Sequence, residues 1–222
     1  MVRMRPDKEE AAVRIAPAML AGRVAPAMLA IFASLIALPI TMPATALASA
    51  QPAQCTKWSS TTEPPPTINV YRVNEGKVDT VDFKDYVMRV VSREWNVKQS
   101  ALRQAGAVAA KQYAWYHVLH YRGGTYNGTC FDVKDTTADQ LYADKAISGL
   151  PSGVKNAVDA TWTWSVHRGS KFPMTGYRTG SDVACAADAG YHLYVRSARK
   201  CAKQGWSAER ILAVYYTGTV LQ

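Results

Sequence analysis

The sequence lacks an apolar run long enough to be a clear membrane span. Its most hydrophobic segment, Val24 to Ile40, is about seventeen residues long, is interrupted by proline and serine, and falls short of the roughly twenty residues that a span needs. Basic residues precede it and small residues follow it, which is the layout of a secretory signal. We therefore predict that residues 1–50 are a signal peptide cleaved after Ala50 or Ala48, with a membrane anchor as the rival interpretation.

Closely spaced metal ligands are also missing. The chain has four cysteines, with no CxxC pair and no histidine close to any of them, so we expect no metal and no other cofactor. An even number of cysteines in an exported chain indicates two disulfides. The sequence leaves three pairings open, of which we favour Cys185 with Cys201, closing a short loop, and Cys55 with Cys130.

Acidic residues are fewer than basic ones, at 17 against 26. Removal of the leader leaves a net charge of about +7, and a basic exported protein is drawn to polyanions such as teichoic acids, carboxylated glycans or acidic lipids. The lysines and arginines are dispersed and form no recognisable nucleic-acid-binding motif, so we expect no nucleic-acid partner. We expect a secreted protein, extracellular or associated with the cell wall, that contacts membrane only through its uncleaved signal.

The mature chain divides into a lead-in and one domain. Residues 51–67 form a proline-rich lead-in ending in Pro64-Pro65-Pro66, which can continue neither a helix nor a central strand. Residues 68–222 are expected to form a single domain, since a chain of this size can bury about 70% of its unfolded surface in one core. No repeat of structural period follows the leader, which excludes a solenoid.

Hydrophobic periodicity predicts the elements of this domain. Ile68 to Val73 alternates apolar and polar residues and is followed by a turn and a second short strand at Val78 to Val81, which indicates a β-hairpin. From Asp82 the spacing becomes helical up to Glu94, and a second, alanine-rich helix is expected over about residues 100–120. Further segments are predicted as a short helix after Thr136 or Thr137, a helix at 154–166, a strand within 172–182, and helices at 193–204 and 208–216. The fold class expected is therefore α+β, with several helices packed on a small antiparallel sheet.

Glu94 is the most informative candidate for chemistry. It continues the stripe formed by Val87, Val90 and Val91, so its carboxyl group should point toward the apolar side of the helix. Burial raises the pKa of a carboxyl group and can keep it protonated near neutral pH, as a general acid requires. The alternative is that Glu94 only ends the helix and pairs with Arg93 or Lys98.

Four strings in one order resemble the SpoIID/LytB family. They are DYVMRVVSREW at 85–95, ALRQAGAVAAKQYAWY at 101–116, FDVKDTTADQLY at 131–142 and YYTGTVL at 215–221. The family pairs a helix ending in a glutamate with an alanine-rich helix and a DTT-x-x-Q-x-Y element. Lys111-Gln112 replaces the common Arg-Thr of the family, and its glycine-rich segment is only loosely represented around His192. Zinc-binding members use Cys and His near the DTT element, but here only Cys130 precedes it.

The resemblance implies an enzyme of the cell wall. Glu94 matches the family's catalytic glutamate, which in lytic transglycosylases cleaves the bond from N-acetylmuramic acid to N-acetylglucosamine in peptidoglycan glycan strands. The family also includes non-catalytic enhancers of a separate wall amidase, and an adhesion or assembly role is a third possibility. The amidase is therefore a second candidate partner beside the glycan strand.

The resemblance and the chemistry of the side chains indicate further candidate site residues. Those expected to bind substrate are Lys111, Tyr113, Asp135, Thr136, Tyr177 and His192. Asp132 or Asp135 could supply a second carboxylate, although aspartate beside Thr-Thr more often caps a turn. Trp162 and Trp164, like Tyr177, could stack on sugar rings, although aromatic residues at helical spacing usually belong to a core.

Overall fold

The computed structural model describes residues 55–190 and 192–222. The expected signal peptide at 1–50 and the first residues of the lead-in lie outside this part. Residues 55–66 precede the first strand and contain no helix or strand. Within the described residues, no helix is both long enough and apolar enough to cross a bilayer.

The main sheet begins with the predicted hairpin. Strand β1 (Thr67–Arg72) pairs antiparallel with β2 (Lys77–Asp82), and β5 (Val133–Lys134) joins the other edge of β1 in parallel. The inward side chains of β1, which include Ile68 and Val70, are fully buried. The pairing of β5 with β1 places the segment 133–142 beside the helix that follows β2, where it contributes to the candidate site.

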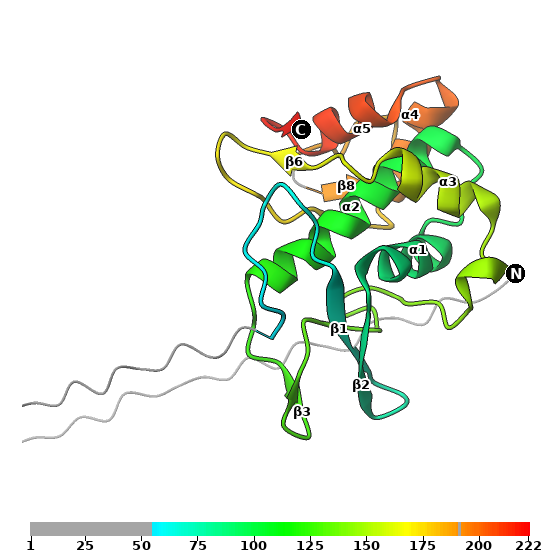
Figure 1. Ribbon diagram of the computed structural model, residues 1–222. Helices are drawn as coiled ribbons and strands as arrows, with labels where there is room; N and C mark the ends of the chain where they lie inside the picture. The colour runs from blue at the N-terminus through cyan, green and yellow to red at the C-terminus, as the bar shows by residue number, and fades with distance from the viewer. Residues whose placement is uncertain (1–54, 191) are drawn as a thin grey trace, which may run out of the picture. The chain divides into compact units, whose positions relative to one another are not determined.

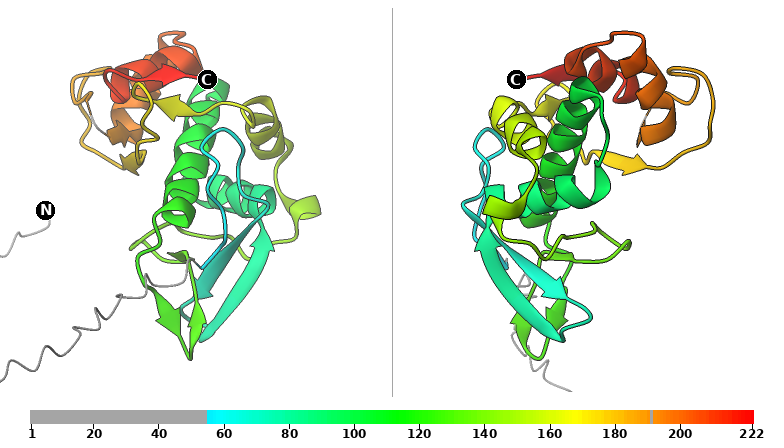
Figure 2. Two further views of the ribbon diagram at one scale, coloured as in Figure 1. Left: turned by 60° about the vertical axis from the view of Figure 1, so that its left-hand side comes forward. Right: turned by 90° about the vertical axis from the view of Figure 1, so that its right-hand side faces the viewer.

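Helix α2 (Ser100–Leu119) is the centre of the described structure (Figure 1). Helices α1 (Phe83–Glu94) and α3 (Ser152–Ala160) pack along one part of it, and α4 (Val195–Lys203) and α5 (Ala208–Tyr215) pack elsewhere along its length. Both views of Figure 2 show the β-hairpins at one end and α4 and α5 at the other. The alanines of α2 other than Ala101 are buried, because small side chains let these neighbouring helices approach closely.

Short elements connect and cover the helices. They are β3 (Thr125–Tyr126), β4 (Thr129–Cys130), the 3-10 helix η1 (Ile147–Gly149), β6 (Val166–His167), β7 (Gly176–Arg178), β8 (His192–Tyr194) and β9 (Val220–Leu221). Strands β3 and β4 pair antiparallel, as do β6 and β9, whereas β7 and β8 pair in parallel. The α+β class is confirmed, with two parallel pairings that the sequence did not reveal.

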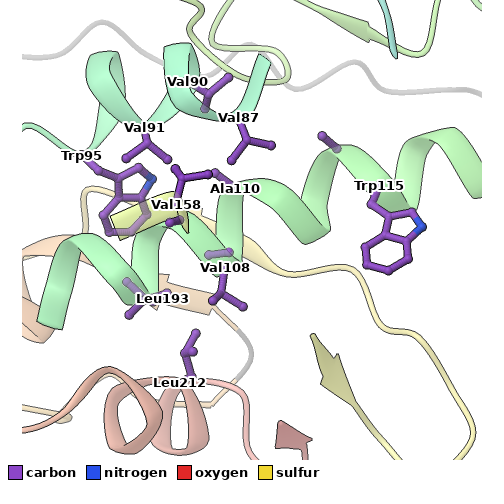
Figure 3. Close-up of a cluster of buried hydrophobic side chains, with 14 of the residues drawn as sticks. Val87, Val90, Val91, Trp95, Val108, Ala110, Trp115, Val158, Leu193 and Leu212 are labelled. Atoms are coloured by element: carbon purple, nitrogen blue, oxygen red, sulfur yellow. The ribbon is translucent and has the colours of Figure 1, made fainter. Parts of the chain in front are cut away.

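The core lies mainly between α1 and α2. Figure 3 shows Val87, Val91 and Trp95 between these helices, and Leu193 and Leu212 on the other side of α2. Gly106 of α2 faces the Trp95 ring, and a Cβ placed there would lie 2.1 Å from a ring carbon. A glycine at this position therefore lets the indole of Trp95 lie directly on the α2 backbone.

Two predicted helices differ from the structure. No helix follows Thr136, where the chain makes a turn and then runs irregularly to Leu141. Helix α3 ends at Ala160, because Val166 leaves the helix to pair with Leu221 in β6 and β9. In both places long-range contacts override the local periodicity.

Candidate active site

Glu94 is the last residue of α1, and its position follows from how that helix begins. Asp82 accepts a hydrogen bond from the Asp85 backbone N–H (2.9 Å), which fixes the first turn. The buried stripe of α1 then holds the last turn against α2, and Trp95 directly after Glu94 is fully buried. Glu94 itself is half-buried, as its place on the apolar face predicted.

The carboxyl group of Glu94 contacts two distant segments. Its Oε1 accepts a hydrogen bond from the Leu141 backbone N–H (2.6 Å), and its Oε2 accepts one from the Tyr177 hydroxyl. Neither Arg93 nor Lys98 forms an ion pair with it among the described residues. The helix-end pairing considered from the sequence is therefore absent in this part of the chain, and the carboxyl group joins α1 to β7 and the 133–142 segment.

The environment of Glu94 raises its pKa. Burial is the largest cause, because removal of water disfavours the ionised form. The hydrogen bonds from Tyr177 and Leu141 oppose this shift, because they stabilise the carboxylate. Glu94 is therefore poised to hold a proton more readily than an ordinary glutamate while still being able to release it.

Gln140 organises the far side of this site. Its amide nitrogen donates to the Tyr177 hydroxyl (2.9 Å) and to the Ala110 carbonyl (3.0 Å), and its amide oxygen accepts from the Tyr86 hydroxyl (2.9 Å). Gln140 is fully buried. Burial also raises the pKa of Tyr177 well above its usual value, and the charge of Glu94 adds to this effect, so the hydroxyl remains a donor.

Gln140 and Tyr86 are site residues that the sequence did not lead us to expect. The signal for Gln140 was present, because it is the glutamine of the DTT-x-x-Q-x-Y element. Tyr86 lies in the apolar stripe of α1 and is indistinguishable by spacing from a core residue.

Tyr113 belongs to a neighbouring cluster around Asp139. The Tyr113 hydroxyl donates to Asp139 Oδ1 (3.2 Å), and the same oxygen accepts from Arg122 (2.7 Å) while Oδ2 accepts the Lys134 backbone N–H (2.7 Å). The Tyr113 and Tyr177 ring centroids are 6.4 Å apart. The structure thus places Tyr113 beside Tyr177, the hydrogen-bond partner of Glu94, and joins Asp139 to this cluster.

Asp135 and Thr136 stabilise a turn instead of approaching Glu94. Asp135 accepts from Arg72 Nε (3.0 Å) and from the Val73 backbone N–H (2.9 Å), and Thr136 Oγ1 accepts from the Ala138 backbone N–H (3.4 Å). These contacts match the turn-capping alternative for the DTT element. They hold the 133–142 segment on β1 and so position Leu141.

Lys111 is also structural. It is only 2% exposed, and its ammonium group donates to the carbonyls of Thr161 (3.1 Å), Trp162 and Trp164 (2.6 Å). Burial lowers its pKa to about 7, while the carbonyl acceptors favour the charged form. The expected substrate contact for Lys111 is therefore corrected, because its donors close the turn after α3.

The remaining candidates form no hydrogen bond with the Glu94 carboxyl group, whose partners among the described residues are Leu141 and Tyr177. Asp132 is buried, accepts from Thr56 (2.6 Å) and the Asn69 backbone N–H (2.9 Å), and has its pKa raised by burial. His192 is half-buried in β8, and its ring packs over Gly176, which leaves no room there for a Cβ. Trp162 packs against Phe83, with ring centroids 6.0 Å apart.

The cysteines are paired as we favoured. Cys55 is bonded to Cys130 and Cys185 to Cys201, with Cα–Cα distances of 5.5 and 4.8 Å. No group of three or more metal-ligating side chains occurs within residues 55–190 and 192–222.

A hollow of about 480 Å³ lies beside the end of α1. Arg93 and Asn96, on either side of Glu94 in the sequence, line it together with Tyr142, which follows Leu141. The contact between Glu94 and Leu141 therefore joins two segments that border open space.

Comparison with protein-family models gives a match for the first part of the domain. Residues 71–165 match the SpoIID family model, described as stage II sporulation protein. The matched segment includes Glu94 and Gln140, whereas Tyr177 and His192 lie beyond it. No curated protein matches the chain.

Proposed function

We propose that this chain, which carries a SpoIID domain at residues 71–165 and is thus related to sporulation and cell-wall proteins, is a peptidoglycan lytic transglycosylase. Its substrate would be the glycan strand, cleaved between N-acetylmuramic acid and N-acetylglucosamine. The observation that supports this best is the Glu94 carboxyl group, held by Tyr177 and Leu141 in surroundings that raise its pKa. Export through the leader at residues 1–50 would deliver the protein to the wall.

The reaction needs one group that both donates and accepts a proton. Protonated Glu94 gives its proton to the glycosidic oxygen as the bond to the muramic acid anomeric carbon breaks. The resulting carboxylate takes the proton of the muramic acid 6-hydroxyl, whose oxygen bonds to the anomeric carbon. Glu94 ends protonated again, no water is consumed, and the product has a 1,6-anhydro end. This differs from glycosidases that use two carboxylates.

Tyr177 and Gln140 fit the needs of such a group. The Tyr177 hydroxyl donates to Glu94 and accepts from Gln140, so the orientation of the carboxyl group is fixed from behind. The hydrogen bond stabilises the carboxylate that forms after the first proton transfer. Tyr177 and Gln140 are thus proposed as positioning residues.

The alternative function is a non-catalytic amidase enhancer. One observation favours it, namely that both oxygens of Glu94 already accept hydrogen bonds within the protein. A carboxylate so satisfied could simply stabilise the junction of α1 with β7. An enhancer would cleave no glycan but would accelerate an added wall amidase.

Substitution of Glu94 distinguishes these functions. Glu94→Gln keeps size and polarity but removes the transferable proton, so we expect normal folding and a glycan-cleavage rate that falls by roughly 100-fold or more. Glu63→Gln, at an exposed glutamate in the lead-in, is the matched control and should cleave at the parent rate. Full activity in Glu94→Gln would refute the assignment, and an inactive parent that stimulates an amidase would establish the enhancer.

A further inference from the structure

Three hollows adjoin one another along the surface beyond Glu94. The hollow of about 480 Å³ beside α1 shares Asn96 with a second of about 300 Å³, and the second shares Arg199 and Lys203 with a third of about 540 Å³. We call their combined lining the basic track. Its basic residues are Arg93, Arg103, Lys145, Lys98, Arg196, Arg199, Lys200 and Lys203. The acidic residues in it are Asp144 and Asp182.

Part of the positive charge on α4 is unfavourable for the helix itself. Arg196, Arg199, Lys200 and Lys203 recur at three- and four-residue spacing on one face, where like charges repel. The first turn contains no acidic residue, and the cation of Arg196 lies at the positive end of the helix dipole. Lys200 and Lys203 lie in the last turn, where the helix dipole favours cations, but the dipole does not account for Arg196 and Arg199.

Few carboxylates in the described structure neutralise these side chains. Lys200 pairs with Asp182 (2.9 Å), whereas Arg196, Arg199 and Lys203 make no ion pair with any described residue and are exposed. Three unpaired cations on one short helix form a concentrated positive potential. A polyanion would relieve their mutual repulsion.

Packing of the opposite face of α4 orients its basic face toward solvent. Ser197, Ala198 and Cys201 are fully buried, Ser197 Oγ donates to the Ala184 carbonyl (2.9 Å), and Cys201 is bonded to Cys185. Helix α4 is therefore fixed in rotation by packing and by a covalent bond. The cations are presented as a set before any ligand arrives.

We propose that the basic track binds a linear phosphate-bearing polymer of the cell wall, of the polyol-phosphate class. Guanidinium groups match phosphate oxygens in paired hydrogen bonds, and a row of cations suits an anion that repeats along a chain. No aromatic side chain lines the second or third hollow, so the stacking surface that single-stranded nucleic acid uses is missing there. The track begins beside the helix end that carries Glu94, so a bound wall polymer would hold the protein near its glycan.

A charge-matched pair of variants tests this proposal on the whole protein. One replaces Arg196, Arg199 and Lys203 by Gln, and the control replaces Lys57, Lys155 and Lys171, which lie outside the track, by Gln. The probe is a purified glycerol-phosphate polymer of defined length, titrated by calorimetry at several salt concentrations. Because phosphate contacts dominate such binding, we expect Kd to rise about tenfold or more in the track variant and its salt dependence to weaken, with little change in the control.

Three results would overturn the proposal. They are equal weakening in both variants, tighter binding of a carboxylated glycan, or tighter binding of a DNA oligonucleotide of the same charge. The proposal does not depend on glycan cleavage. Both variants should cleave short neutral glycans at the parent rate. If the parent itself cleaves no glycan, the proposed enzyme activity is refuted, but the polymer titration still tests the basic track.

Discussion

At the scale of single residues, the pKa of Glu94 is set by opposing effects. Burial raises it, and the hydrogen bonds from Tyr177 and Leu141 lower it, with burial the larger effect. A strongly raised pKa would make a poor base, and an unshifted one a poor acid at neutral pH. The two donors therefore limit the shift and let one carboxyl group serve both steps.

Tyr177→Phe removes one of these donors while keeping the ring. Loss of the hydrogen bond should raise the pKa of Glu94 further, so the fall of kcat at high pH, where the acid form is lost, should move to higher pH. We also expect kcat to drop roughly tenfold because the carboxyl group is less well oriented. Tyr121→Phe removes a hydroxyl that donates to the Gly124 carbonyl (2.8 Å) and is the control. An unshifted pH profile of kcat in Tyr177→Phe would contradict the assigned contact.

The buried side chain of His117 should make folding stability depend on pH. It is 5% exposed, and neither ring nitrogen has a hydrogen-bond partner among the described residues. Burial lowers its pKa to about 4, the charge of Arg122 adds to this shift, and Asp139 opposes it. The unfolded chain takes up a proton first as pH falls, so stability is full above the unfolded pKa and is lost toward about pH 4.

Replacement of His117 should flatten the stability curve. Between pH 7 and pH 5 the parent should lose roughly 2 kcal/mol of unfolding free energy through this one group. In His117→Leu the unfolding free energy should fall less between pH 7 and pH 5, and the difference from the parent should be about the same 2 kcal/mol. Denaturant unfolding at each pH measures it. Parallel curves for parent and His117→Leu would show that the buried ring is not responsible.

At the scale of elements, the local hydrophobic pattern correctly predicted the helices and strands whose own residues carry a regular apolar periodicity. The first hairpin, α1, α2, α4 and α5 follow it closely, and the Ser207 side chain caps α5. The errors fall where contacts distant in sequence decide. Val166 pairs with Leu221, and the segment around Thr136 is held by Arg72 at Asp135 and by Glu94 at Leu141. No local period encodes such partners.

The crossing of α1 and α2 depends on Gly106. Gly106→Ala would gain helix propensity, but its Cβ would overlap the fully buried Trp95 ring, so we expect a net loss of about 1–3 kcal/mol in unfolding free energy. Trp95 follows Glu94, so glycan cleavage should fall as well. Gly149→Ala, where a Cβ meets no atom within 4 Å, is the control. An unchanged stability in Gly106→Ala would mean that the helices are not in close contact there.

At the scale of the whole molecule, the candidate site joins three separate segments. Glu94 bonds Leu141, 47 residues away, and Tyr177, 83 residues away. The sequence indicated Glu94, Tyr113 and Tyr177 as members of the site but not their contacts. Lys111, Asp135 and Thr136 instead stabilise the frame around it. A match to a family's sequence pattern cannot distinguish a residue that contacts substrate from one that stabilises the fold.

The mass of the products is the most direct measurement of the central claim. Purified glycan strands digested with the parent protein and with Glu94→Gln should be compared by mass spectrometry beside a lysozyme digest. The account predicts anhydro ends, lighter by one water than the lysozyme products, from the parent and almost none from Glu94→Gln. Reducing ends from the parent would show hydrolysis by water, and anhydro ends formed equally by Glu94→Gln would show that another residue moves the proton.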